Sequence, residues 1–202
     1  MSSTPMRPNP VPPDALALQR LYHWERSAPE RIVLTQPLGG GVVRNYTWGQ
    51  VMDESRRMAA HLKSLSFEPG SRIAILSKNC AHWLMADFAI WLAGHVSVPL
   101  YPTLAAGTIG QILEHSEARL LFVGKLDGWE AMKAGVAASL PCIAMPLAPR
   151  TDHPSWEAIV ASTGPLRGEP LRDAAAQRLG QHHTVGCAAL PVIEALQRER
   201  IE

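Results

Sequence analysis

The run Ser77-Lys78-Asn79 places a hydroxyl, an ammonium and an amide where a fold can use them. It follows the apolar run 72–76 (RIAIL) and precedes the long apolar segment 80–94. Ligands collect at the carboxyl ends of strands in open α/β sheets, and helix N-termini attract anions. The run therefore favours a site for an anionic ligand. The alternative is that Asn79 only caps the helix that follows.

The segment 99–103 (PLYPT) follows the next apolar run, so it is predicted to lie at the same edge of the sheet. Its two prolines stiffen the loop, and Tyr101 offers an amphipathic surface. Two interpretations stay open. Tyr101 lines a substrate or cofactor cleft, or it anchors the loop.

The only glycine cluster, Gly39 to Gly41, is a candidate phosphate-binding loop. Such a loop follows a strand, opens a helix and usually ends in lysine with serine or threonine. Here the next residues are VVRNYTW, which predict a strand and contain no lysine. The cluster is therefore predicted to form a turn, because glycine supplies the positive φ that a tight hairpin needs.

Histidine and cysteine give no metal-binding or nucleophile pattern. No histidine pair has HExxH spacing, and adjacent side chains such as His182 and His183 point apart on a helix or a strand. His115-Ser116 is interpreted as a helix end, no GxSxG elbow exists, and the cysteines are expected to be small buried residues. No catalytic, cofactor-binding or metal-ligating residue is predicted. The residues considered are His23, His61, His82, His95, His115, His153, His182, His183, Cys80, Cys142 and Cys187.

Composition limits the class of protein. Of 202 residues 47% are hydrophobic and 18% charged, and 19 basic against 18 acidic side chains leave a net charge of +1. This is typical of a globular domain and gives no indication of nucleic-acid binding. Three widely spaced cysteines and the lack of a signal-peptide core predict a cytoplasmic protein. The longest apolar stretch, 80–94, is too short to span a bilayer, so at most peripheral membrane contact is expected.

The first part of the chain predicts two helices around a hairpin. Residues 14–28 carry apolar side chains at helical spacing. Residues 31–35 and 42–46 are β-rich runs joined by PLGGG, which indicates a hairpin. Residues 47–66 then predict a helix that Thr47 caps.

Four short apolar runs follow, at 72–76, 95–100, 119–123 and 142–145, each separated from the next by enough residues for a helix. Continuous apolar strands that alternate with helices predict a mostly parallel sheet covered on both faces. The intervening segment 80–94 is apolar nearly all round, so its helix should be deeply buried. The predicted fold class is α/β, a layered domain flanked by helices and preceded by a small hairpin.

The chain divides into three regions. Residues 1–13 form a Pro-rich lead-in, 14–165 an α/β domain, and 166–202 a divergent tail. One short helix is predicted at 154–162. The tail contains plausible helix ends but no run that would continue the sheet.

Two segments carry a family resemblance. YTWGQVMDESRRMAAHL, from Tyr46, has an aromatic–Thr–aromatic lead into a long helix, and WLAGHVSVPLYPT, at 91–103, has a helix–Gly–strand–Pro step. With SEARLLFVGKLDGW after them, these segments resemble the N-terminal part of the AMP-forming acyl-CoA synthetases, or adenylate-forming ligases. The similarity leans towards the long-chain fatty acyl-CoA synthetases and covers residues 21–162.

Such enzymes use ATP and Mg²⁺ to turn a carboxylate into an acyl-adenylate, and then transfer the acyl group to coenzyme A. The resemblance implies fatty acid, ATP and coenzyme A as partners of a full-length protein, and an incomplete N-terminal α/β domain for residues 14–165. The family's phosphate loop (TSGTTGxPKG), its adenine and ribose contacts and its catalytic lysine lie beyond the matching region. No family site residue is therefore carried over, and this chain alone is expected to show no turnover and no tight cofactor binding.

The tail 166–202 is hypothesised to be read out of frame. Around Asp173 the family would run into a strand of the type Leu-Ala-Ser-Ile-Ile, and residues 179–183, back-translated and read one nucleotide later, permit that sequence. A phosphate loop should then be encoded downstream in another frame. Missing strands should leave an exposed sheet edge and an apolar patch, and so favour self-association. The alternative hypothesis is a non-enzymatic interaction or regulatory module related to the synthetases.

Overall fold

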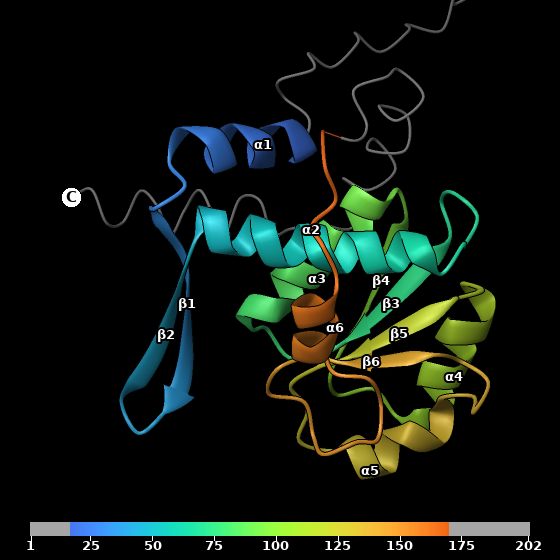
Figure 1. The fold of residues 1–202 in the computed structure, drawn as a ribbon. Coiled ribbons are helices and arrows are strands. Elements are labelled where there is room, and N and C mark those ends of the chain that lie inside the picture. Colours follow the sequence, from blue (N-terminus) through green and yellow to red (C-terminus); the bar gives the residue numbers. More distant parts are fainter. Residues whose placement is uncertain (1–16, 170–202) are drawn as a thin grey trace, which may run out of the picture.

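The computed structural model describes residues 17–169, which form a layered α/β domain with a hairpin at one side (Figure 1). The predicted lead-in 1–13 and most of the predicted tail, from residue 170 on, lie outside the described residues. In chain order the elements are α1 (Ala17–Ser27), β1 (Ile32–Gly39), β2 (Val42–Thr47), α2 (Trp48–Ser64), β3 (Arg72–Leu76), α3 (Ala81–Ala93), β4 (Val96–Leu100), α4 (Ala106–His115), β5 (Leu120–Val123), α5 (Trp129–Met132), the 3₁₀ turn η2 (Lys133–Gly135), β6 (Cys142–Ala144) and α6 (Trp156–Ser162).

The main sheet has four strands in the order β4-β3-β5-β6, and every neighbouring pair is parallel. The hairpin β1-β2 is a separate antiparallel sheet. Each main strand matches a predicted apolar run within one residue at either end. The predicted α/β fold class with a preceding hairpin is therefore confirmed.

Side chains of the central strands alternate between two cores, as a sheet covered on both faces requires. Ile73 and Ile75 pack with α1, α2, α3 and α6 on one face. Ala74 and Leu76 pack with α4 and α5 on the other face. Burying each such Ile or Leu side chain contributes about 1.5–3 kcal/mol, so the strands need apolar residues at consecutive positions.

α3 lies against the sheet and beneath α2, and 11 of its 13 residues are buried. This confirms the deep burial that its apolar circumference predicts. The helix ends at Gly94, whose φ of 84° is the left-handed conformation that glycine adopts without strain.

Among the described residues, side chains cap the N-termini of α2, α3 and α6, the last through Ser155. Thr47 and Gln50 form a reciprocal capping box at the start of α2, with bonds of 3.3 and 2.9 Å. The predicted cap of α3 by Asn79 is wrong. Gln36 of β1 instead accepts a hydrogen bond of 2.8 Å through Oε1 from the backbone N–H of Ala81. The hairpin thereby fixes the start of α3.

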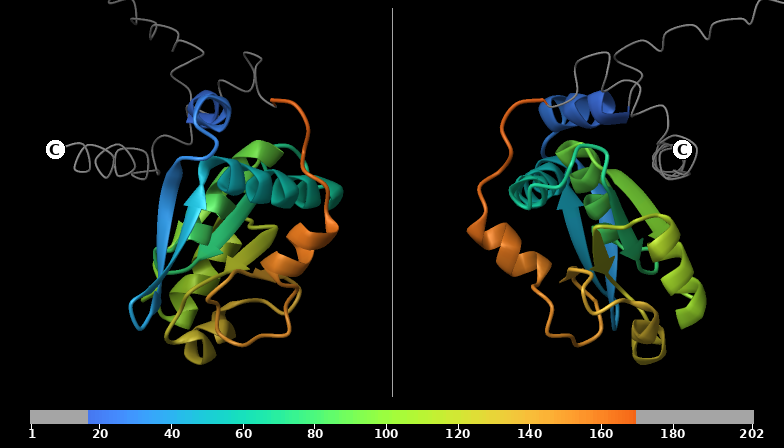
Figure 2. Two further views of the ribbon diagram at one scale, coloured as in Figure 1. Left: turned by 60° about the vertical axis from the view of Figure 1, so that its left-hand side comes forward. Right: turned by 90° about the vertical axis from the view of Figure 1, so that its right-hand side faces the viewer.

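The segment 163–169 runs from α6 along α2 toward α1 (Figure 2). Arg57 donates to the carbonyl of Thr163 at 3.0 Å, and Arg56 donates to those of Leu166 and Gly168 at 3.1 and 2.7 Å. The backbone N–H of Leu166 donates in return to Arg56 O at 3.1 Å. The predicted boundary at 165/166 therefore falls within an anchored segment, and the boundary itself stays a prediction.

Each outer edge of the main sheet is interrupted at one position. β4 carries Pro99, which has no N–H to offer, and Ala144 of short β6 forms a bridge with Ser155. The exposed aliphatic side chains of the β-structure gather on the hairpin instead, at Ile32, Leu38, Val42 and Val43. The apolar patch and the self-association expected from missing strands stay predictions.

No helix among residues 17–169 combines the length and the apolar character needed to cross a membrane.

Candidate functional site

The crevice between β3 and β5 is where this topology would place a ligand. The chain leaves β3 toward α3 on one face of the sheet and leaves β5 toward α5 on the other. Neighbouring strands with diverging connections open a crevice at their carboxyl ends. The predicted segment 77–79 follows β3 and meets Gly124 and Lys125 after β5. Segment 99–103 begins in β4 and ends at the same edge, as predicted.

Hydrogen bonds join the two sides of this crevice. The backbone N–H of Lys78 donates to Lys125 O at 2.8 Å, and that of Gly124 donates to Leu76 O at 3.0 Å. Ser77 Oγ, in a side chain only 3% exposed, accepts from the backbone N–H of Lys125 at 3.0 Å. A Cβ at Gly124 would lie 2.3 Å from that oxygen, so only glycine fits. The backbone N–H groups of Lys78, Gly124 and Lys125 and the hydroxyl of Ser77 are therefore satisfied within the chain.

Charge at the rim of the crevice is partly neutralised. Lys78 forms an ion pair with Asp127, and both side chains are substantially exposed. Such surface pairs contribute at most about 1 kcal/mol, so an anion could displace Asp127. The first N–H of α3 is already bonded to Gln36. Binding of an anionic ligand at Ser77-Lys78-Asn79 therefore stays a prediction. It would depend on the charge of the Lys78 ammonium group.

Tyr101 is 77% exposed. Its backbone carbonyl closes a turn with the N–H of Leu104 at 3.3 Å, while its ring lies in solvent. The ring therefore does not anchor the loop by packing. A role for Tyr101 in lining a cleft stays a prediction.

A polar cluster that sequence reasoning missed lies among the side chains of α2, α3 and α6. Glu54 Oε2 accepts from Trp156 Nε1 at 2.9 Å and lies 3.3 Å from His82 Nε2. Trp156 and His82 are almost fully buried. Burial acts to raise the pKa of Glu54, but hydrogen bonds from His82 and Trp156 outweigh it, and the pKa lies below its usual value. Glu54 is therefore a carboxylate at neutral pH.

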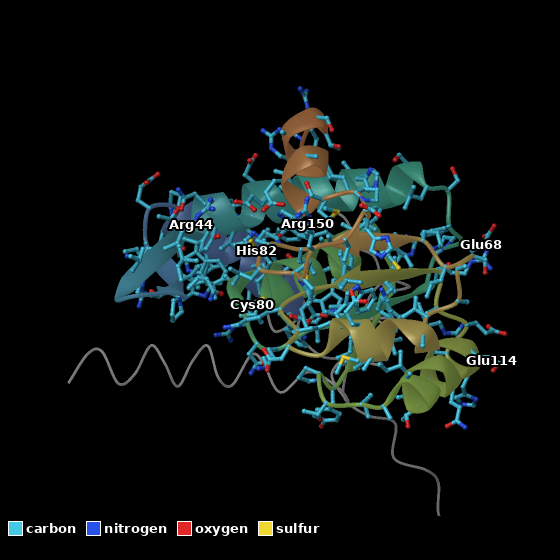
Figure 3. All side chains as sticks on the ribbon, turned by 90° about the horizontal axis from the view of Figure 1, so that it is seen from below. Arg44, Glu68, Cys80, His82, Glu114 and Arg150 are labelled. Atoms are coloured by element: carbon cyan, nitrogen blue, oxygen red, sulfur yellow. The ribbon has the colours of Figure 1, made fainter. Side chains whose placement is uncertain are left out.

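The hairpin joins the same cluster through its base. The ring of Tyr46 meets the ring of His82 edge-on at 5.5 Å, and the guanidinium of Arg44 lies 4.7 Å from the centre of the Tyr46 ring. Burial raises the pKa of the Tyr46 phenol, so that hydroxyl stays protonated. Figure 3 places Arg44 and His82 at one side of the molecule, near Cys80. The cluster ties three helices and the hairpin together beside the carboxyl edge.

The remaining histidines and cysteines of the described residues form no metal centre: no group of three or more His, Cys, Asp or Glu side chains is placed to hold a metal ion there. Burial raises the pKa of the Cys142 thiol to about 11, so it stays protonated. His115 ends α4, as predicted. His182, His183 and Cys187 lie outside the described residues.

A hollow of about 990 Å³ lies between α4 and η2 and extends to Arg119 and Pro141, which precede β5 and β6. Its walls carry Gly107, Gly110 and Gly135, with Glu114 and Glu117 at the rim. Figure 3 shows Glu114 on the side away from Arg44 and Cys80. None of the residues that line the hollow belongs to 77–79 or 124–125, so the hollow shares no wall with the crevice described above.

The sequence model of the family described as AMP-binding enzyme matches residues 21–195. The chain belongs to this family. The resemblance found in the sequence is confirmed.

Curated proteins that are similar to this chain include long-chain ligases. The long-chain-fatty-acid–CoA ligase FadD15 of Mycobacterium tuberculosis is 32% identical over 123 residues, which is 61% of this chain and 20% of that protein. Long chain acyl-CoA synthetase 1 of Arabidopsis thaliana is 36% identical over 77 residues, 38% of this chain and 12% of that one. The chain thus spans about a fifth or less of the length of these relatives.

Solved structures of CoA ligases agree with this chain in fold. The anthranilate CoA ligase AuaEII, in complex with anthranoyl-AMP, superposes with a TM-score of 0.67 at 19% identity, over 81% of this chain and 32% of that one. The benzoate CoA ligase of Burkholderia xenovorans LB400 superposes with a TM-score of 0.65 at 18% identity, over 77% and 30%. At this identity the likeness concerns the fold alone.

Proposed function

We propose that this chain is an N-terminal portion of an ATP-dependent, AMP-forming ligase that joins a long-chain fatty acid to coenzyme A. The observation that carries the proposal is the family match over residues 21–195, together with 32% identity to a long-chain-fatty-acid–CoA ligase over 123 residues. The reaction converts the fatty carboxylate to an acyl-adenylate with ATP and Mg²⁺, and then to the thioester. This chain contributes a scaffold to that reaction.

The contacts at the carboxyl edge support inactivity of the chain alone. Acyl-adenylate formation needs donors and positive charge that hold phosphate oxygens while charge moves between them. Among the described residues, the glycine cluster 39–41 lies in the hairpin turn, with φ values of 96°, 58° and 78°. The backbone N–H groups of Lys78, Ala81 and Lys125 donate to atoms of the chain itself. Lys78 and Lys125 supply positive charge at this edge, but the backbone N–H groups beside them are not free to bind phosphate oxygens.

Palmitoyl-CoA formation from palmitate, Mg·ATP and coenzyme A tests the proposal. FadD15 of Mycobacterium tuberculosis serves as the positive control and a heat-treated sample of the chain as the blank. We expect the purified chain to match the blank, because it holds the scaffold without the phosphate contacts. Palmitoyl-CoA above the blank from the chain alone would refute the inactive-scaffold proposal.

A further inference from the structure

The segment 163–169, here called the strap, runs along α2 and is held there by Arg56 (Figure 2). One terminal nitrogen of this guanidinium donates to the carbonyls of Leu166 and Gly168, at 3.1 and 2.7 Å. The backbone N–H of Leu166 donates back to Arg56 O at 3.1 Å, and the Leu166 side chain packs against the apolar core. The later part of the strap therefore depends on Arg56 for its polar contacts with α2.

The same guanidinium binds α1. Its Nε and its second terminal nitrogen donate to the two carboxylate oxygens of Glu25, at 2.8 and 2.7 Å, and its Cζ lies 5.3 Å from the centre of the Tyr22 ring. Tyr22 is fully buried, and the Arg56 side chain is only 12% exposed. Pairing through two N–H groups is directional, because both lie in the plane of the guanidinium. Arg56 therefore joins α1 and the strap, which are far apart in the sequence.

Each contact orients the guanidinium for the other. The Glu25 carboxylate and the Tyr22 ring fix the plane of the guanidinium, and in this orientation the remaining terminal nitrogen meets the strap carbonyls. If α1 moved away, the freed arginine would lose side-chain entropy on binding the strap alone, and the converse holds for Glu25. A partly exposed ion pair of Arg26 with Glu169 adds little. The two contacts of Arg56 are therefore cooperative.

We propose that Arg56 is a conformational latch, through which α1 and the strap close onto α2 and open from it as one unit. Regions at the margin of a domain open locally while its centre stays folded. Opening would uncover Leu21 and Tyr22, the buried side chains of α1, and would leave α3 and the sheet in place. Because the polypeptide continues after Glu169, a partner or a pull acting on it there would reach α1 through Arg56.

Hydrogen exchange at single amides of the purified chain measures this opening. In the wild type, the amide of Leu166 and those of the last two turns of α1 should have opening constants that agree within about threefold and exceed those of β3. Glu25→Gln is the sharpest variant, because Glu25 reaches the strap through Arg56. We expect exchange in α1 and at Leu166 to rise together, by at least about tenfold, with β3 unchanged.

Asp53→Asn is the matched control. It makes the same carboxylate-to-amide change beside Arg57, which donates to the carbonyl of Thr163 at the start of the strap. This variant should leave exchange in α1 unchanged. Arg56→Lys keeps the charge but removes the planar fork, so it should raise exchange in α1 and in the strap as Glu25→Gln does.

Four results would each overturn the latch. They are wild-type opening constants of α1 and Leu166 that differ more widely than stated, faster exchange in α1 alone in Glu25→Gln, a rise that β3 shares equally, and an equal effect of Asp53→Asn on α1. The wild-type comparison needs no variant to fold. Acyl-CoA formation plays no part in this test, so its result is independent of the proposed function.

Discussion

Removing the Glu54 carboxylate should destabilise the domain far more than removing its neighbour. Glu54 accepts from Trp156 Nε1 at 2.9 Å, and His82 Nε2 lies 3.3 Å away. In Glu54→Ala both buried nitrogens lose this partner. Leaving a buried donor unsatisfied costs about 1–3 kcal/mol. Because the Glu54 side chain is 20% exposed, water can replace part of the loss, and we expect a decrease in unfolding free energy of about 3 kcal/mol.

Asp53→Ala is the matched control on the same helix. Asp53 is exposed and pairs with Arg57 at 2.8 Å one turn away. Exposed pairs of this kind contribute about 0.3–0.5 kcal/mol. Both variants place alanine in the interior of α2. Helix propensity rises by a few tenths of a kcal/mol more in Asp53→Ala than in Glu54→Ala, which is small beside the difference expected from the buried contacts.

Urea unfolding at pH 7, followed by tryptophan fluorescence, measures both variants. Equal losses of unfolding free energy would refute the reasoning, since they would mean that the buried contacts of Glu54 contribute nothing. The pH dependence gives a second check. The pKa of Glu54 is lower in the folded chain, so its stabilisation is present above the ordinary value near 4.5 and is lost as the pH falls through the folded value. In that acidic range, the difference in unfolding free energy between the wild type and Glu54→Ala should decrease.

Three further perturbations have expected outcomes in the same unfolding assay. Gln36→Ala should lower the unfolding free energy by about 1 kcal/mol, because the N–H of Ala81 loses its cap. Gly124→Ala should lower it by about 1–3 kcal/mol, because the new Cβ meets Ser77 Oγ. Burial lowers the pKa of His95, so stability should fall as the pH drops below about 6.5, and His95→Asn should flatten that slope.

Two of these perturbations have a comparison within the chain. Gly164→Ala adds a Cβ with no atom within 4 Å and should change stability little, so an equal effect at Gly124 would count against the close approach. Burial lowers the pKa of His61 too, so His95→Asn should reduce the acid slope without abolishing it. If His95→Asn left the slope of unfolding free energy against pH unchanged, His95 would not contribute to the loss of stability in acid.

The strands of the main sheet could be predicted because each is buried on both faces. A parallel strand covered by helices on both faces needs apolar side chains at consecutive positions. A short run such as RIAIL fits this role and few others. The hairpin was predicted with strands that end too early. β1 continues through Pro37 to Gly39, because an edge strand tolerates a residue without an N–H.

Long-range side-chain contacts could not be predicted. Gln36 caps the N–H of Ala81 from 45 residues away. The local preference for Asn just before a helix predicted Asn79 instead, because it takes no account of residues that are distant in the sequence. Glu54 and Trp156 are 102 residues apart. One signal was available: Glu54 lies three residues after Val51 and four before Met58, on the apolar face of α2. A carboxylate on such a face needs buried donors, but the sequence does not name them.

The central claim is that this chain is a family scaffold without its own nucleotide site, and calorimetric titration with Mg·ATP tests it most directly. We predict no saturable heat up to about 1 mM ATP, which corresponds to a binding free energy weaker than about −4 kcal/mol. FadD15 under the same conditions provides the positive signal. Saturable binding to the purified chain, lost in Lys78→Ala, would contradict the claim and place a phosphate site at the carboxyl edge of β3.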